Sequence, residues 1–369
     1  MAECASAFHV PEASLRAQIG AVLGAWGFGP DAVAAGTDGL AYADLRGIHS
    51  HGIAMLPIYE RWRSEGRFVA GATPSVVKEN AVSALIDGGS GLGFLPATVA
   101  MRLAIAKAMT AGVSAVSVRR SNHFGAAGHY AVMAAQDGLI GLALSNTVAP
   151  AIVPTGGREA RFGTNPIAFA APAARSEPFV LDMATSTVAL GKLMMAAYRD
   201  ETIPLGWALD ATGRPTTDAT AGYASRLATP LGALPELSSH KGSGLAAMVE
   251  ILSAVVSGAT PAMDTTPGQP GDVGHFFLAL DPAIFRCRAE YGAALDRLME
   301  KVRATEPAEP GLPVQVAGDP EREALRHSRT GGICLPAALI RELEPLVARA
   351  GCEWHLPDHS GDPRHQGIS

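Results

Sequence analysis

Aromatic and charged residues are both scarce in this chain. Phe, Trp and Tyr together make up 6% of the 369 residues, and Asp, Glu, Lys and Arg make up 17%, with a formal net charge of −6. A surface on which nucleic-acid bases could stack is therefore poorly supplied, and no run of lysine and arginine resembles a stripe that follows a phosphate backbone. These shortages argue against a nucleic-acid-binding protein.

Cysteine is also sparse, and the four residues, Cys4, Cys287, Cys334 and Cys352, include no close pair. This spacing argues against a zinc ribbon or a disulfide scaffold and fits a reducing compartment. The first residues carry an acid where a signal peptide has a positive charge, and no apolar core follows. No apolar run approaches the roughly 20 residues that a membrane span needs. The sequence therefore predicts a cytoplasmic protein with no membrane partner.

The signatures of common nucleotide and metal sites are missing. The cluster GGSGLG at 88–93 follows a predicted strand, but it does not spell G-x-G-x-x-G, and a plain turn is the better interpretation. Neither a P-loop nor an H-E-x-x-H motif is present. Asp44, His49, His51 and His123 could ligate zinc, but His49 and His51 do not share a helical face. We expect no metal.

The chain does contain enough apolar residues, 48%, for a well-buried globular enzyme. Apolar spacing predicts helices towards both ends, and short apolar runs bounded by Gly, Pro, Asn or Asp predict buried strands between them. The pattern indicates an α/β fold with helical termini around a sheet-bearing middle. The expected helices cover 12–27, 31–43, 53–62, 95–110, 128–137, 241–256, 283–304 and 335–349, and the expected strands cover 81–87, 113–118, 139–144, 166–171, 179–181 and 275–280.

Two histidines lie in polar segments that suit an active site. His51 stands between Ser50 and Gly52 in a segment between two predicted helices, and His123 follows a predicted buried strand. Active sites of sheet proteins commonly lie just beyond strand ends. An imidazole suits proton transfer at neutral pH because its unperturbed pKa is about 6.5. Each histidine could instead be a structural residue with satisfied hydrogen bonds.

Asp182 and Lys241 are further candidates. Asp182 ends an apolar run, and a buried carboxylate needs a partner: a histidine, a cofactor hydroxyl, or the N-terminus of a helix expected from Ser186. Lys241 opens a predicted helix together with Gly242 and Gly244, which brings a cation and free N–H groups to a possible anion. Helix capping alone would explain these glycines equally well.

The chain carries six spaced polar and glycine-containing segments: ADLRGIHSHG at 43–52, SNHFGAAG at 121–128, FGTNP at 162–166, LDMATS at 181–186, IPLGWA at 203–208 and KG at 241–242. In this order they resemble the malate/L-lactate dehydrogenase family of NAD(P)-dependent oxidoreductases. Its relatives include ureidoglycolate, sulfolactate and diketogulonate enzymes and a reductase of piperideine-2-carboxylate. The resemblance extends from about residue 12 to residue 350.

The resemblance implies a non-Rossmann fold, a homodimer, and an extended nicotinamide cofactor, NAD(H) or NADP(H), near the subunit interface. The chain would then consist of an N-terminal helical segment over 1–75 that packs with the C-terminal part, and a central NAD(P)-binding region over 76–260 that bears the sheet. A C-terminal α/β segment over 261–350 and a loose tail over 351–369 would follow.

The resemblance also assigns roles to particular residues. The proton donor and acceptor would be His123, or the pair Ser50 and His51, with Asp182 as a relay. The cofactor would contact Ser145, Asn146, Thr147, Asp182, Met183, Ala184, Lys241, Ala317, Gly318 and Asp319. The substrate would contact Arg46, His51, Met55, His123, Thr164 and Asn165.

One departure from the family pattern concerns Met55. Many members carry arginine at this position, three residues after Ser-His-Gly, and that arginine suits a substrate carboxylate. We therefore expect hydride transfer between a nicotinamide and the 2-carbon of a small oxo or hydroxy acid, with the acid itself undetermined. The alternatives are a reductase of a cyclic imino acid, a member that binds cofactor without catalysis, and a zinc-dependent hydrolase.

Overall fold

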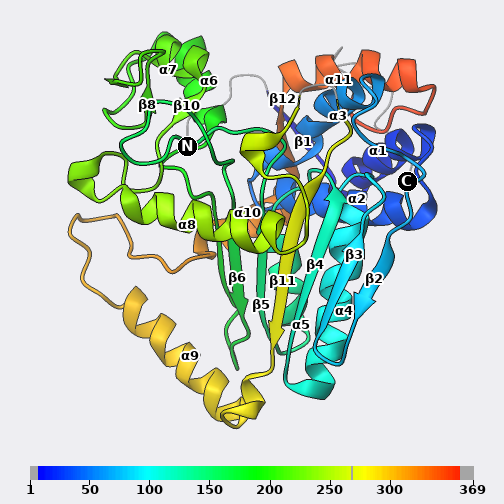
Figure 1. Cartoon of the computed structure of the whole chain (residues 1–369), viewed down its shortest axis with the longest axis vertical. Coiled ribbons are helices and arrows are strands. Elements are labelled where there is room, and N and C mark those ends of the chain that lie inside the picture. Colours follow the sequence, from blue (N-terminus) through cyan, green and yellow to red (C-terminus); the bar gives the residue numbers. More distant parts are fainter. Residues whose placement is uncertain (1–6, 267–268, 358–369) are drawn as a thin grey trace. The chain divides into compact units, whose positions relative to one another are not determined.

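The structure is a computed structural model, and it describes residues 7–266 and 269–357 (Figure 1). The chain divides into two compact units. The terminal unit consists of residues 1–66 together with 319–369, and the central unit consists of residues 67–318. These boundaries fall elsewhere than the segment limits expected from the sequence at 75, 260 and 350. Part of the expected tail, 358–369, lies outside the described residues.

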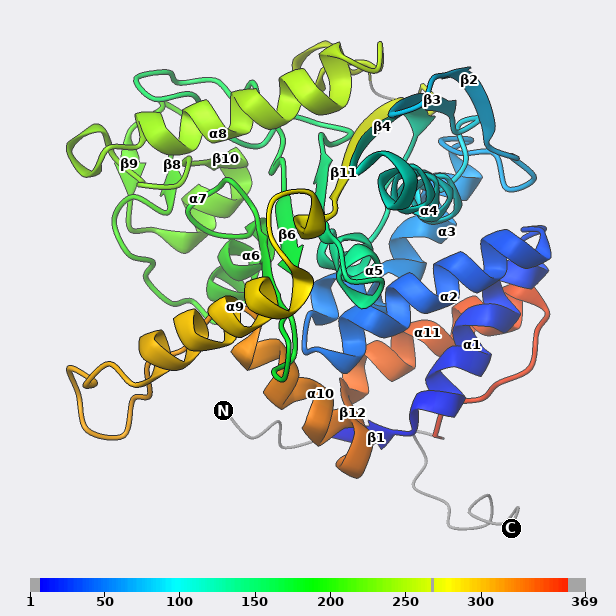
Figure 2. The same ribbon diagram turned by 90° about the horizontal axis from the view of Figure 1, so that it is seen from below.

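The terminal unit is built from both ends of the chain (Figure 2). Its two strands pair antiparallel, α1 packs against α2, and α11 packs against α3. The apolar stripe of α1, which includes Leu15, Ile19 and Val22, is fully buried, as its helical spacing predicts. The elements are β1 (Ala7–Val10), α1 (Glu12–Ala25), α2 (Pro30–Leu45), η1 (His49–His51), η2 (Ile53–Met55), α3 (Leu56–Ser64), α10 (Asp319–Gly331), β12 (Ile333–Pro336) and α11 (Ala337–Ala350).

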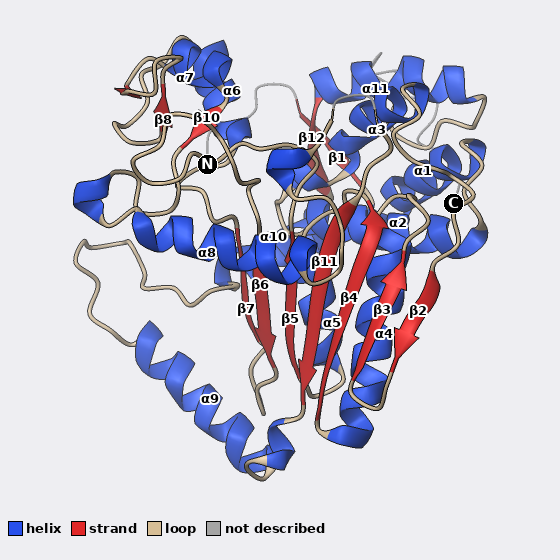
Figure 3. Cartoon of the chain, in the orientation of Figure 1, coloured by secondary structure: helices blue, strands red, loops and turns tan. Residues whose placement is uncertain are grey.

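A seven-stranded sheet forms the core of the central unit (Figure 3). Every neighbouring pair in it is antiparallel except β3 and β4. This pattern differs from the mostly parallel Rossmann sheet and agrees with the missing dinucleotide fingerprint. In spatial order the strands are β2 (Ser75–Glu79), β3 (Ser83–Asp87), β4 (Val113–Ser121), β11 (Val273–Leu280), β5 (Ile140–Ser145), β6 (Ile167–Ala171) and β7 (Phe179–Met183).

Helices cover both faces of this sheet (Figure 2). On one face, α4 (Phe94–Ala111) packs on β4 and β11, and α5 (Gly128–Gln136) packs on β5 and β6. On the other face, α8 (His240–Glu250) continues into η4 (Ile251–Val255), a π-helical turn that packs on β11. The central strands of the sheet are therefore buried between two helical layers, whereas β2 at one edge is exposed.

The helix α4 is long and apolar enough to cross a membrane by length and composition alone. Half of it is buried inside the structure, where Ala97, Ala100, Met101 and Ala104 are fully enclosed. A core helix of a soluble protein passes the same test of length and composition.

A second, smaller core lies within the central unit between residues 188 and 219. Val188, Leu193, Ile203 and Ala208 are buried together there, with Trp207 packed against them. The remaining elements of the unit are α6 (Leu190–Tyr198), β8 (Ala208–Leu209), β9 (Pro215–Thr216), α7 (Ala219–Ser225), β10 (Leu227–Ala228), η3 (Pro235–Leu237), η5 (Ala262–Asp264), η6 (Pro282–Ile284) and α9 (Arg288–Arg303).

The α/β fold class predicted from the sequence is confirmed, and each of the six predicted strands overlaps a strand of the large sheet. The helix expected to run from 241 to 256 is α-helical only to Glu250 and then widens into η4. The helix expected from residue 335 begins at Ala337, because β12 occupies the residues before it.

Candidate active site

Asp44 anchors the loop of the terminal unit that carries His51. Its side chain is buried near the end of α2, and its Oδ2 accepts a hydrogen bond from the backbone N–H of Ile53 at 2.6 Å. Its Oδ1 lies 3.0 Å from Nδ1 of His49. Burial raises the pKa of Asp44, and the bonds to His49 and Ile53 oppose that rise. A Cβ on Gly52 would come within 2.1 Å of the carboxylate, so the loop requires glycine there.

Ser50 and His51 form a hydrogen-bonded pair on η1. The distance between Ser50 Oγ and His51 Nδ1 is 2.9 Å. With the hydroxyl as donor, a neutral His51 carries its proton on Nε2. Burial lowers the pKa of His51, so the ring is neutral at pH 7, and in this tautomer Nδ1 is the nitrogen that can accept a proton. The pair therefore has the geometry of an acid/base group.

Arg46 and Met55 flank this loop in the sequence. The Arg46 guanidinium lies 3.8 Å from the centroid of the Tyr42 ring, and its Nη1 donates to the Tyr42 carbonyl at 3.4 Å. Met55 is 8% exposed and ends η2 where α3 begins. An arginine in the place of Met55 would bring a charge to a largely buried position, which is costly without a partner.

In the central unit, the loop after β4 carries His123. Asn122 is buried, and it donates from Nδ2 to the Arg67 carbonyl at 2.8 Å and accepts at Oδ1 from the backbone N–H of His123 at 3.1 Å. The backbone N–H of Gly125 donates to Nδ1 of His123 at 3.3 Å. Because Nδ1 accepts, the proton of the neutral ring is on Nε2. The imidazole is partly exposed, and its Nε2–H can donate a hydrogen bond to a ligand.

Asp182, on β7, caps the helix that follows this loop. Its Oδ2 accepts a hydrogen bond from the backbone N–H of Gly128, the first residue of α5, at 2.7 Å. Two expectations about Asp182 were wrong. The residue is exposed, not buried, because β7 is the last strand of its sheet. It does not cap a helix from Ser186, because the next helix begins only at Leu190.

A buried histidine, His275, joins three strands below the His123 loop. Its Nδ1 lies 2.9 Å from Ser145 Oγ at the end of β5, and its Nε2 lies 2.8 Å from Ser121 Oγ at the end of β4. Ser145 also donates to the Asn146 carbonyl at 2.7 Å. Complete burial lowers the pKa of His275 to about 3, so the ring is neutral. The Ser145 side chain is therefore committed to this network.

Glu250 is the centre of a second buried network. Its Oε1 accepts from Nδ2 of Asn146 at 3.1 Å and from the backbone N–H of Ala262 at 2.7 Å, and its Oε2 accepts from Nδ2 of Asn165 at 2.7 Å. Asn146 and Asn165 are 2% and 0% exposed. Their Nδ2 groups therefore bond Glu250, whereas the buried Oδ1 of Asn165 has no hydrogen-bond partner among the described residues.

The FGTNP segment packs closely against the ends of β5 and β7. A Cβ on Gly163 would come within 1.9 Å of Thr147 Oγ1. The Thr164 carbonyl accepts from the backbone N–H of Thr185 at 2.9 Å and from its hydroxyl at 3.1 Å. The predicted ligand contacts that remain partly exposed in this region are Thr147, Thr164, Met183 and Ala184.

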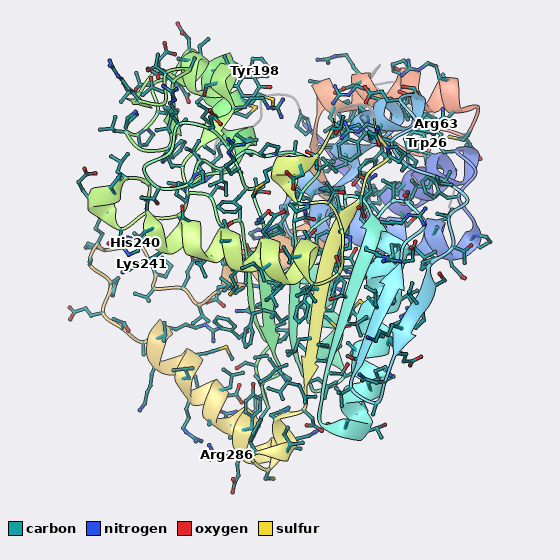
Figure 4. The ribbon with its side chains drawn as sticks, in the orientation of Figure 1. Trp26, Arg63, Tyr198, His240, Lys241 and Arg286 are labelled. Atoms are coloured by element: carbon teal, nitrogen blue, oxygen red, sulfur yellow. The ribbon has the colours of Figure 1, made fainter. Side chains whose placement is uncertain are left out.

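Lys241 lies in the first turn of α8 beside His240, and both side chains are exposed (Figure 4). Gly242 is required by packing, because a Cβ there would meet the Leu231 carbonyl oxygen at 2.2 Å. The same helix start is held by Thr155, whose hydroxyl lies 2.9 Å from Ser239 Oγ. The Lys241 side chain is therefore exposed at a helix terminus whose backbone is tightly packed.

The three residues Ala317, Gly318 and Asp319 span the boundary between the units. The Ala317 carbonyl accepts from the backbone N–H of Val180 on β7 at 3.4 Å, which brings this segment next to Asp182 in the central unit. Asp319 begins α10 in the terminal unit and forms an ion pair with Arg322.

Glu250 and His275 were not singled out by the sequence. A signal was present for both, since each is a polar residue inside an apolar run, MVEIL at 248–252 and VGHFF at 273–277. A buried polar residue of this kind needs partners and therefore indicates a network. Within residues 7–266 and 269–357, no group of three or more His, Cys, Asp or Glu side chains is placed to hold a metal ion.

Comparison with known proteins gives a consistent result over nearly the whole chain. The family model described as malate/L-lactate dehydrogenase matches residues 10–344. The malate dehydrogenase of Pyrococcus horikoshii is 37% identical over 319 residues, which cover 86% of this chain and 88% of that protein. Its solved structure superposes with a TM-score of 0.86 over 94% of this chain and 97% of that chain.

Two further relatives carry other activities in their names. The L-sulfolactate dehydrogenase of Methanocaldococcus jannaschii is 35% identical over 84% of this chain and 88% of its own length, and its structure gives a TM-score of 0.85. The structure of delta1-piperideine-2-carboxylate reductase from Pseudomonas syringae is 30% identical, covers 92% of this chain and 99% of that chain, and gives a TM-score of 0.81.

Proposed function

The chain belongs to the malate/L-lactate dehydrogenase family, and on this premise we propose that it interconverts a small 2-oxo acid and the matching 2-hydroxy acid, with one of its own histidines as proton donor and acceptor. It is an oxidoreductase that acts on a CH–OH group with NAD(H) or NADP(H). Reduction of a carbonyl consumes a proton, so a group that can donate one must lie near the carbonyl oxygen.

The state of the His123 ring is the observation that carries this proposal. Its Nδ1 accepts the Gly125 N–H, which leaves the proton on Nε2 of a partly exposed ring beyond the end of a strand. His51 offers the same arrangement in the terminal unit, with Ser50 at its Nδ1. During reduction the protonated ring, an imidazolium, donates its Nε2 proton, and during oxidation a neutral ring that carries its proton on Nδ1 accepts one at Nε2.

The residues of the central unit fit a nicotinamide dinucleotide by their chemistry. A carboxylate accepts more than one hydrogen bond, so Asp182 can bond a ribose hydroxyl while it holds Gly128. Lys241, at a helix start, suits the pyrophosphate. The bound cofactor supplies or accepts the hydride. Further contacts in the central unit are proposed at Thr147, Met183, Ala184, Ala317 and Gly318.

In the terminal unit, Arg46 and Met55 are the proposed substrate contacts. Met55 cannot donate a hydrogen bond, so the end of the substrate that faces it is apolar. Arg46, stacked on Tyr42, is the cation nearest in sequence that could hold the single carboxylate. The enzyme would then prefer an oxo acid with a hydrocarbon tail over doubly charged oxaloacetate.

Reduction of a cyclic imino acid is the second candidate. Such a substrate has one carboxylate and an apolar ring, which suits the apolar Met55. The similarity to the piperideine-2-carboxylate reductase structure supports this candidate. Reduction of the C=N bond would need the same hydride transfer and, at most, the same proton donor.

Assembly as a homodimer in the cytoplasm completes the proposal. Exposed apolar residues lie along α8 and η4, where Met248, Ile251 and Val255 are 38%, 53% and 62% exposed. This stripe at helical spacing suits burial against a second copy. The three described cysteines are free thiols, as in a reducing compartment.

The test is a panel of 2-oxo acids and cyclic imines, with the loss of NADH and NADPH absorbance followed in parallel. Turnover of at least one monocarboxylic 2-oxo acid supports the main proposal. Turnover of the imines alone would replace it by the second candidate. Cofactor binding without turnover of any member of the panel would make the chain a non-catalytic member.

A further inference from the structure

The buried ring of His275 stacks directly on Phe124, the residue after His123. The two ring centroids are 4.5 Å apart and the planes differ by 3°. On its other side Phe124 stacks on Tyr130, with centroids 4.9 Å apart, and the Tyr130 hydroxyl donates to the Phe124 carbonyl at 2.6 Å. Phe124 is therefore held between two rings, and its backbone is held as well.

The orientation of the His275 ring is itself fixed. Ser121 Oγ bonds one ring nitrogen and Ser145 Oγ bonds the other, so rotation of the ring would break both hydrogen bonds in a site without water contact. The backbone next to the ring is also tightly packed. A Cβ on Gly274 would meet the Ser253 carbonyl oxygen at 2.1 Å, which presses the start of β11 against η4.

We infer that His275 is a positioning residue for the reaction, because its locked ring holds Phe124 and thereby sets the place of the adjacent His123 imidazole. This inference rests on the proposed role of His123. Nε2 of a catalytic imidazole must lie within hydrogen-bond reach of the reacting oxygen, and a misplacement of about 1 Å can reduce turnover about 100-fold. His275 does not touch the reacting atoms in this account; it acts through Phe124.

The test compares His275→Leu with the control Val116→Ala. Val116 is fully buried on the neighbouring β4 and is paired with Phe277, so its truncation weakens the same sheet while both hydrogen bonds of the His275 ring stay in place. At a temperature well below both unfolding midpoints, we expect kcat of His275→Leu to fall about 10- to 100-fold, with little change in KM or in the dissociation constant of the cofactor. The control should keep its kcat.

A spectroscopic readout makes the test independent of turnover. In ¹⁵N NMR, the His123 ring, identified by the signals lost in His123→Asn, should show the Nε2–H tautomer in the wild type and a mixture in His275→Leu. Phe124→Leu removes the other ring of the same stack and should reproduce the lower kcat and the mixed tautomer. This variant replaces His275→Leu in the test if His275→Leu does not fold.

The outcomes separate the two proposals. An unchanged His123 tautomer together with a kcat no lower than in Val116→Ala overturns the role of His275. A changed tautomer in a protein whose wild type reduces no 2-oxo acid or imine would leave the positioning intact and overturn the proposed function.

Discussion

The carboxylate of Asp182 and the backbone N–H of Gly128 lie 2.7 Å apart, and this hydrogen bond ties β7 to the helix that follows the His123 loop. Asp182 is therefore able to affect His123 through structure, in addition to the cofactor contact that we propose for it. The two roles can be separated, because asparagine caps a helix about as well as aspartate but carries no charge.

We predict that Asp182→Ala lowers the free energy of unfolding by about 1 kcal/mol, the usual value of a lost helix cap, and strongly reduces activity. Asp182→Asn should keep most of the stability and lose cofactor affinity. Asp218 is a matched control, since it caps α7 by accepting the Ala221 N–H at 3.0 Å. Asp218→Ala should lose stability and keep kcat. Thermal unfolding and cofactor titration measure these effects, and full activity in Asp182→Ala would contradict the prediction.

Gly52→Ala should destabilise the terminal unit by about 1 to 3 kcal/mol and reduce turnover, because the new Cβ displaces the Asp44 carboxylate that holds Ile53. Gly24 on α1 is the control. It has nothing within 4 Å of its Cβ position, so Gly24→Ala should be neutral or stabilising. Denaturant unfolding of the two variants compares them directly. Equal free energies of unfolding for Gly52→Ala and Gly24→Ala would show that the loop around Gly52 can shift to make room for the new Cβ.

Replacement of the true proton donor should lower kcat by roughly two to four powers of ten, with little change in cofactor affinity. The variants are His51→Ala and His123→Ala. If both keep rates near that of the wild type, the proposed acid/base chemistry is wrong.

The pH dependence distinguishes the two histidines. Burial lowers the pKa of His51, and reduction needs the protonated donor. If His51 donates, kcat for reduction should therefore be highest at acidic pH and fall as the pH rises through a value below 6.5. This fall of kcat with rising pH should be absent in His51→Asn. Its persistence in that variant would assign the proton donation to His123 instead.

Lys241→Ala should weaken binding of NADH or NADPH, because a cation and free N–H groups at a helix start are natural partners of phosphate. Lys301→Ala, on α9, is the control for the same change of net charge at another exposed position. Fluorescence titration gives both dissociation constants. An unchanged dissociation constant of the cofactor for Lys241→Ala would indicate that Lys241 has a structural role or binds the substrate instead.

Met55→Arg should shift the substrate preference towards dicarboxylic acids, since an arginine can bind a second carboxylate through two hydrogen bonds. The position is only 8% exposed, so we also expect the variant to be less stable. The measurement is kcat/KM for oxaloacetate and for a branched monocarboxylic oxo acid in both proteins. A wild-type preference for oxaloacetate would refute the apolar-pocket proposal.

The sequence predicted those elements that have strong local patterns. Strands such as β5 and β6 are apolar runs with sharp ends, and α1 has a clear apolar stripe. In contrast, β2 is exposed at every residue, β8 has only two residues, and α10 has no buried residue. Strands β2 and β8 are held by hydrogen bonds to neighbouring strands, and α10 lies against α2 and β12, so a pattern of buried residues within each element does not reveal them.

The same limit applies to the candidate site. His51, His123 and Asp182 could be selected as candidates because they are polar residues next to the ends of predicted elements. The hydrogen-bond partner of Asp182 could not be predicted, because Gly128 lies 54 residues away in the sequence. The family resemblance placed cofactor contacts at Ser145 and Asn146, but their side chains form hydrogen bonds to His275 and Glu250, which lie more than 100 residues later in the sequence.

The position of β11 between β4 and β5 has a consequence for how the chain folds. Residues 273–280 fill the centre of a sheet whose other strands are complete by residue 183. During synthesis, the edges of β4 and β5 that pair with β11 therefore remain without hydrogen-bond partners until about a hundred further residues have emerged. We expect slow folding, as for other non-local pairings, and a nascent chain that depends on protection from aggregation until its last central strand arrives.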